Sequence, residues 1–141
     1  MALEYTDELR QKVGAEIQNV TIALSNLKEA KERNSKSVIE LAAEATFIHN
    51  IYNGIENILT QILKAYSIKI PKTENWHKDL LDAASHKGII STEISDELYD
   101  YLAFRHFFVH AYGFMLNETK MAPLVTNASD IWSRFLAEIG F

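Results

Sequence analysis

The stretch SVIELAAEATFIHNIYNGIENILTQILKAY, residues 37–66, decides the fold class. Its apolar residues recur every three or four positions, as they do on one face of an α-helix. They are Val38, Leu41, Ala45, Ile48, Tyr52, Ile55, Leu59, Ile62 and Tyr66. A second stripe, at Ile39, Ala42, Ile51 and Ile58, widens that face. Ser37 and Glu40 have the spacing of a capping box. The pattern therefore predicts a long helix that is buried over much of its surface.

The same spacing extends outward to the rest of the chain. Residues 9–27 form an amphipathic pattern that begins at Thr6 or Asp7, and a polar turn near Asn34 separates it from the long helix. A short helix is expected from Trp76 to near Gly88, a fourth over about residues 94–116, and a loop over 117–123. A last helix follows, with Asn127 as its cap. Two long helices joined by a short turn pack antiparallel. The fold class is therefore predicted as all-α, an antiparallel bundle of about five helices in a single domain, residues 1–141.

Composition and charge narrow the classes of function. The chain has 141 residues and no cysteine, which excludes disulfides, thiolate zinc sites and cysteine nucleophiles. Its formal net charge of −5 does not draw the whole molecule onto nucleic acid or acidic membranes. RNA would therefore need a local site. Neither a signal peptide nor an apolar run of about 18 residues is present, so we expect a cytoplasmic protein with no membrane segment.

The fourth predicted helix is apolar on two sides. One arc of its helical wheel is aromatic and is expected to face the core: Phe104, Phe107, Phe108, Ala111, Phe114 and Met115. The opposite side carries further apolar residues: Leu98, Leu102, Val109 and Gly113. A helix that is apolar all round is buried all round. We therefore expect a second copy of the chain to cover the second face, which makes the protein a two-fold homodimer through this helix.

Polar residues interrupt this second face. Arg105 and His110 lie about 140° apart on the wheel, whereas His106 and His110 share one side and Arg105 and Tyr112 share another. One helix thus holds two edges of a site, and two copies would bring both edges into one cleft. An arginine fork suits phosphate oxygens, and histidine can move a proton near neutral pH. The pattern favours phosphate chemistry.

The segment Arg105-His-Phe-Phe-Val-His110-Ala-Tyr112 resembles the R-x4-H-x-Y motif of HepT-type toxins, a branch of the HEPN superfamily of all-helical ribonucleases. The resemblance implies a HEPN-type bundle and a metal-independent endoribonuclease that needs no cofactor. It also implies homodimers with the motif helices at the interface. The system would be a type VII HEPN/MNT toxin–antitoxin pair, whose antitoxin is a minimal nucleotidyltransferase of the MntA type.

The resemblance also assigns roles to single residues. Arg105 would stabilise the phosphate in the transition state, and His110 would act as general base or general acid. His106 occupies the family's polar position after the arginine and would orient substrate or the catalytic histidine. Tyr112 matches the tyrosine to which the antitoxin attaches AMP, so that modification would silence the nuclease.

Two other functions remain open at this point, a non-catalytic HEPN module that binds a nucleotidyltransferase or its substrate, and a plain helical dimerisation protein. Arg105 and His110 could form a structural polar pair, and His106 and Tyr112 could be interface residues. The polar stretch at His49, Asn53, Glu56 and Asn57 is interpreted as a solvated helix edge, with a supporting layer for the cleft as the alternative. Trp76-His77 is interpreted as a packing anchor. No ligand set of suitable spacing supports a metal site.

Overall fold

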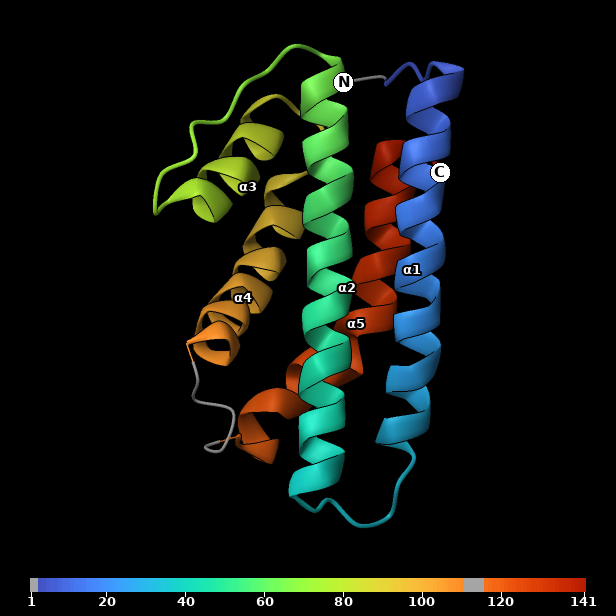
Figure 1. The fold of residues 1–141 in the computed structure, drawn as a ribbon, viewed down its shortest axis with the longest axis vertical. Coiled ribbons are helices and arrows are strands. Elements are labelled where there is room, and N and C mark those ends of the chain that lie inside the picture. Colours follow the sequence, from blue (N-terminus) through green and yellow to red (C-terminus); the bar gives the residue numbers. More distant parts are fainter. Residues whose placement is uncertain (1–2, 111–115) are drawn as a thin grey trace.

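The computed structural model describes residues 3–110 and 116–141, and within these ranges it contains five helices and no strand (Figure 1). The helices are α1 (Asp7–Lys31), α2 (Val38–Ala65), α3 (Trp76–His86), α4 (Thr92–Val109) and α5 (Glu118–Ile139). The all-α prediction is confirmed. In the part of the chain that the structure describes, no helix is long and apolar enough to span a membrane.

The first two helices form the expected antiparallel hairpin (Figure 1). Thr6 caps α1 by accepting a hydrogen bond from the Leu9 N–H, and Ser37 and Glu40 make the predicted capping box at the start of α2. The two helices pack tightly at Gly54, where an added Cβ would lie 2.2 Å from Cγ2 of Val20. A side chain at position 54 would push the helices apart, so the glycine fixes how closely α1 seats on α2.

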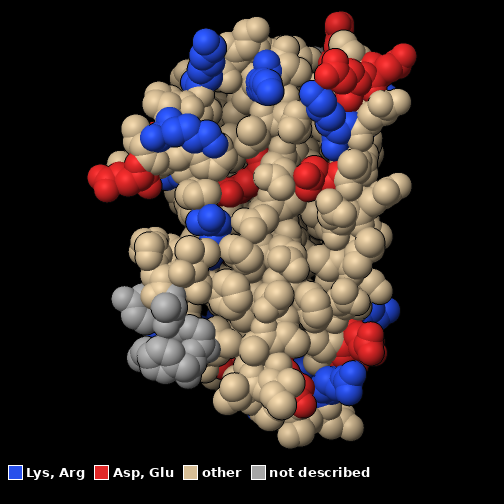
Figure 2. Space-filling view, in the orientation of Figure 1, with Lys and Arg blue, Asp and Glu red and all other residues tan. Residues whose placement is uncertain are grey.

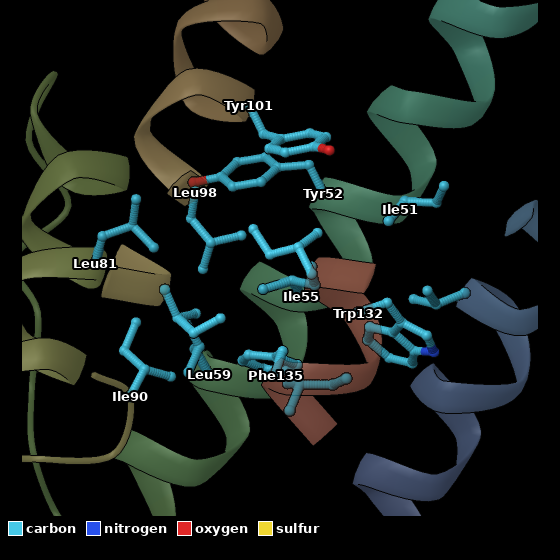
Figure 3. Packing of buried hydrophobic residues seen from close by; sticks show 14 of the residues in the cluster. Ile51, Tyr52, Ile55, Leu59, Leu81, Ile90, Leu98, Tyr101, Trp132 and Phe135 are labelled. Carbon is cyan, nitrogen blue, oxygen red and sulfur yellow. The ribbon is translucent and has the colours of Figure 1, made fainter. Parts of the chain in front are cut away.

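Helix α2 lies at the centre of the bundle. Helices α3 and α4 pack along one side of it and α1 along the other, while α5 lies behind α2 in the view of Figure 1. The core is therefore built around apolar α2 side chains such as Ile55 and Leu59, which meet Leu81, Leu98 and Phe135 from three other helices (Figure 3). Beside these apolar contacts, the side of α2 that faces α3 and α4 also carries polar side chains, which form the candidate site.

The ends of α4 and α5 differ from the sequence prediction. Helix α5 begins at Glu118, because the Asn117 side chain accepts a hydrogen bond from the Lys120 N–H, and Asn127 lies inside the helix. We expected a loop up to Pro123, but this proline lies within the helix. Proline removes one backbone donor and bends a helix, and the first turns of α5 run at an angle to the rest (Figure 1). The described part of α4 ends at Val109, with His110 as its C-cap.

Helix α4 also turns a different face to the core than the wheel predicted. Its buried apolar residues are Ile94, Leu98 and Tyr101, spaced by four and three, whereas Phe104, Phe107 and Phe108 are only half-buried. Leu98 has no exposed surface, so it cannot belong to a free second face. The prediction followed the arc of the helix with the most phenylalanines. The orientation of the helix is instead set by the side chains that pack nearest α2. Arg105 lies four residues after Tyr101 and so shares the inward face.

Candidate functional site

A chain of hydrogen bonds connects Arg105 of α4 to the middle of α2. Arg105 Nε donates to Asn53 Oδ1 over 3.3 Å, and Asn53 Nδ2 lies 3.0 Å from His49 Nε2. An amide nitrogen can only donate, so Nε2 of His49 is the acceptor and the imidazole carries its proton on Nδ1. Asn53 and His49 are one turn apart on α2, which places both beside the arginine. They form a supporting layer for Arg105, the alternative that the sequence had left open.

The surroundings of His49 keep its imidazole neutral. Burial lowers the pKa of His49, and the nearby Arg105 guanidinium lowers it further. Its Nδ1 atom is buried and has no hydrogen-bond partner in the part of the chain that the structure describes. The ring also packs against Phe108, with 5.1 Å between ring centroids. A neutral ring at this position can accept the Asn53 hydrogen bond. The protonation state of His49 is therefore coupled, through Asn53, to the orientation of Arg105.

A second polar pair joins α2 to α3. Both carboxylate oxygens of Glu56 lie 2.9 Å from Nδ1 of His77, and only 4% of Glu56 is exposed. The interpretation of Glu56 as part of a solvated edge is therefore wrong. His77 does more than the packing expected of Trp76-His77, although its ring does contact that tryptophan edge to face. The sequence contained a signal for this burial. Glu56 directly follows Ile55 and precedes further apolar residues one turn on, so it lies within the buried stripe of α2.

Tyr52 precedes Asn53 in the chain, and the charges of both groups act on it. Its side chain is fully buried beside Tyr101, and its hydroxyl points toward α4 (Figure 3). The hydroxyl has no hydrogen-bond partner among the residues described. Burial raises the pKa of Tyr52 most, the Glu56 carboxylate raises it further, and the Arg105 guanidinium opposes both. The Glu56 carboxylate and the Arg105 guanidinium therefore both act on the same phenol.

The two motif histidines are at the exposed end of α4. The rings of His106 and His110 lie 4.3 Å apart between centroids, and the His110 N–H donates to the His106 carbonyl over 3.2 Å. Both side chains are exposed, unlike the half-buried Arg105. The structure brings the histidines together and places Arg105 on a different side of the helix, as their angular separation predicted, but it turns the arginine toward α2 and not onto the free second face that we expected. Tyr112, like Gly113, lies outside the described residues.

Basic side chains cluster over α3 and the segment before it, with acidic side chains beside them, although the molecule carries a net negative charge (Figure 2). An open hollow there is lined by Lys64, Lys69, Lys72 and Trp76, and no acidic residue lines it. The Lys72 ammonium lies 4.0 Å from the centre of the Trp76 ring, a cation–π contact. In the described ranges, no group of three or more His, Asp or Glu residues is arranged to hold a metal ion.

A family model described as HepT-like protein matches residues 43–140. The match covers more than two thirds of the chain and contains every described residue of the site, from His49 to His110. No match to the chain was found among curated proteins or among solved structures. The match to this family model and the geometry of the site are therefore the two observations from which a function can be inferred.

Proposed function

The chain belongs to the HepT-like family of the HEPN superfamily, and from this premise we propose that it is a metal-independent endoribonuclease. It would be the toxin of a type VII HEPN/MNT toxin–antitoxin pair, acting in the cytoplasm. The observation that carries the proposal is the held arginine. Asn53 Oδ1 accepts the hydrogen bond from the Nε–H of Arg105. The terminal N–H groups of the guanidinium can then donate to the oxygens of one phosphate.

The reaction needs a fixed positive charge and proton carriers. The ribose 2′-oxygen attacks phosphorus, the bond from phosphorus to the 5′-oxygen breaks, and a 2′,3′-cyclic phosphate and a 5′-hydroxyl result. Arg105 stabilises the charge that develops on the phosphate oxygens. His110 accepts the proton of the 2′-hydroxyl, with His106 beside it to orient the ring or the substrate. Since RNA alone has the 2′-hydroxyl, DNA is not cut.

The homodimer remains part of the proposal, but with a corrected surface. Leu98 is buried within its own protomer, so it cannot contribute to an interface. The apolar residues at the exposed end of α4 include Val109, which is 49% exposed, and the half-buried Leu102, Phe104, Phe107 and Phe108. Arg105 and His110 face different sides of one helix. A partner copy packed on this end would bring its own histidines toward the arginine and complete the site.

Regulation is assigned to Tyr112. This residue follows His110 by two positions, and a nucleotidyltransferase antitoxin of the MntA type would attach AMP to its hydroxyl. The added phosphodiester charge would compete with RNA phosphate for Arg105. We take residues 1–141 as one domain, because α1 residues such as Val13 and Val20 are fully buried in the same core as residues of the matched region.

The test uses purified wild-type chain, RNA and a matched DNA. We expect RNA cleavage that persists in excess chelator, products with cyclic phosphate ends, and no cleavage of DNA. After incubation with the nucleotidyltransferase and ATP, mass spectrometry should locate adenylate on Tyr112 and cleavage should stop, while Tyr112→Phe should escape both effects. Cleavage that needs an added divalent metal, or a wild-type chain that cuts no RNA when purified free of adenylate, would refute the proposal.

A further inference from the structure

We propose that His77, aligned by Glu56, donates the proton that the leaving 5′-oxygen needs during RNA cleavage. The inference rests on the proposed ribonuclease function and adds to it a residue from outside the Arg105–Tyr112 motif. Cleavage by the 2′-hydroxyl needs a base for the attacking oxygen and an acid for the leaving oxygen. His110 supplies the first, and the position of His77 suits the second.

The contact between Glu56 and His77 sets which nitrogen can react. The buried carboxylate engages Nδ1, so this nitrogen carries a proton and the ring is held in one orientation. Nε2 is then the atom that can exchange a proton with substrate. About a third of the His77 side chain is accessible, against 5% for that of Glu56. The carboxylate is thus hidden behind an imidazole that substrate can reach, an arrangement also found where carboxylates orient catalytic histidines.

His77 belongs to the neighbourhood of Arg105. Asn53, which holds the arginine, and Glu56, which holds the histidine, are three residues apart on α2 and so lie on adjacent turns of one face. The charges of Glu56 and Arg105 both act on the buried hydroxyl of Tyr52. One helix therefore positions both a phosphate-binding arginine and a second histidine, each through its own polar side chain.

The surface beyond His77 suits the strand that carries the leaving oxygen. Trp76, which contacts the His77 ring edge to face, also lines the hollow bordered by Lys64, Lys69 and Lys72. Lysines attract the phosphates of a single strand, and an aromatic ring can stack an unpaired base. This is the region where basic side chains cluster in Figure 2. An RNA strand running from Arg105 across α3 would pass His77 first and the lysines next.

Protons and bonds balance in this scheme. His110 removes the proton of the 2′-hydroxyl as the oxygen–phosphorus bond forms. As the bond from phosphorus to the 5′-oxygen breaks, Nε2 of the His77 imidazolium gives its proton to that oxygen. Glu56 keeps its contact with Nδ1 throughout and exchanges no proton with the substrate. Proton transfer from His110 and to His77 through solvent then restores both side chains.

The experiment compares two RNA substrates that differ in one atom. In the second substrate sulfur replaces the 5′-oxygen at the cleaved bond, and a thiolate leaves without needing a proton. His77→Asn should slow cleavage of ordinary RNA by about 100-fold or more and should cut the sulfur substrate within a few-fold of the wild-type rate. His110→Asn should slow both. His86→Asn, at the exposed end of the same helix, should slow neither.

A second variant guards against a folding defect. Glu56→Gln keeps the shape of the side chain and a hydrogen bond to His77, and it should slow ordinary RNA more than the sulfur substrate. Equal losses on both substrates in His77→Asn, or wild-type rates on ordinary RNA, would overturn the role of His77 while leaving the ribonuclease proposal intact. A wild-type chain that cuts neither substrate would instead overturn the ribonuclease proposal itself, and the role of His77 with it.

Discussion

The two halves of α4 are built differently, although one helix contains both. In the first half, Ser91 caps the helix, Ile94 and Leu98 are fully buried, and Glu97 receives a two-pronged contact from Arg134 of α5 at 2.6 Å. In the second half, from residue 102 to 110, no residue is fully buried. The hydrogen bond from Arg105 to Asn53 and the packing of Phe108 on His49 connect that half to α2.

The difference shows how a packed core can aim a reactive group. Leu98, Tyr101 and Arg105 follow one another at three- and four-residue spacing, so the register that buries the leucine also directs the arginine toward α2. The first half contributes stability and orientation. The second half contributes the groups that meet substrate, at the point where the core ends and solvent begins. Variants in the two halves should therefore separate stability from activity.

The largest expected effect is on activity, from the second half of the helix. Arg105→Ala removes the fixed charge and His110→Ala removes the proton carrier, so each should lower RNA cleavage by about 100-fold or more. Neither side chain is part of the apolar core, and we expect thermal melting within a few degrees of wild type. Cleavage rates and melting curves on the same preparations check this. Wild-type cleavage by both variants would show that the site is elsewhere.

The next effect is on stability, from the first half. Leu98→Ala leaves a cavity in the fully buried core, and it should lower the free energy of unfolding by about 3 kcal/mol. Cleavage per folded molecule should stay near wild type at temperatures where the variant is folded, because the Arg105 contact is further along the helix. Urea denaturation measures the first quantity. A strong loss of activity without loss of stability would contradict the division between the halves.

Much of this architecture could be predicted from the sequence, because helix periodicity and capping are local signals. Ser37 and Glu40 formed the capping box as their spacing indicated, and the two long helices paired as a short turn requires. The face that α4 buries could not be predicted, since it depends on which side chains meet α2. The same reason explains Glu56 and His77, which are 21 residues apart and become partners only through packing.

A smaller effect on activity should come from the residue that joins α4 to α2. Asn53→Ala removes the acceptor for Arg105 Nε and leaves the guanidinium free to turn. A hydrogen bond to a charged group contributes roughly 1.5–3 kcal/mol, so cleavage should fall by about 10- to 100-fold. Asn57→Ala, one turn further along α2 and exposed, is the matched control and should cut at the wild-type rate. Equal rates for the two variants would exclude Asn53 as a positioning residue.

The smallest effect is a change in how stability depends on pH, and it concerns His49 behind Asn53. Burial and Arg105 lower the pKa of His49 in the folded chain, so the unfolded chain takes up this proton at a higher pH. As pH falls below the ordinary histidine pKa of about 6.5, the unfolded state gains a proton that the folded state lacks, and stability decreases. Protonation of the folded chain would also turn the His49 acceptor into a donor facing the Asn53 amide.

His49→Gln can accept the same hydrogen bond and does not titrate. Its free energy of unfolding should therefore fall less between pH 7 and 5.5 than that of wild type, whereas His86→Gln should leave the slope unchanged. Identical slopes for wild type and His49→Gln would mean that the imidazole is not held neutral behind the arginine.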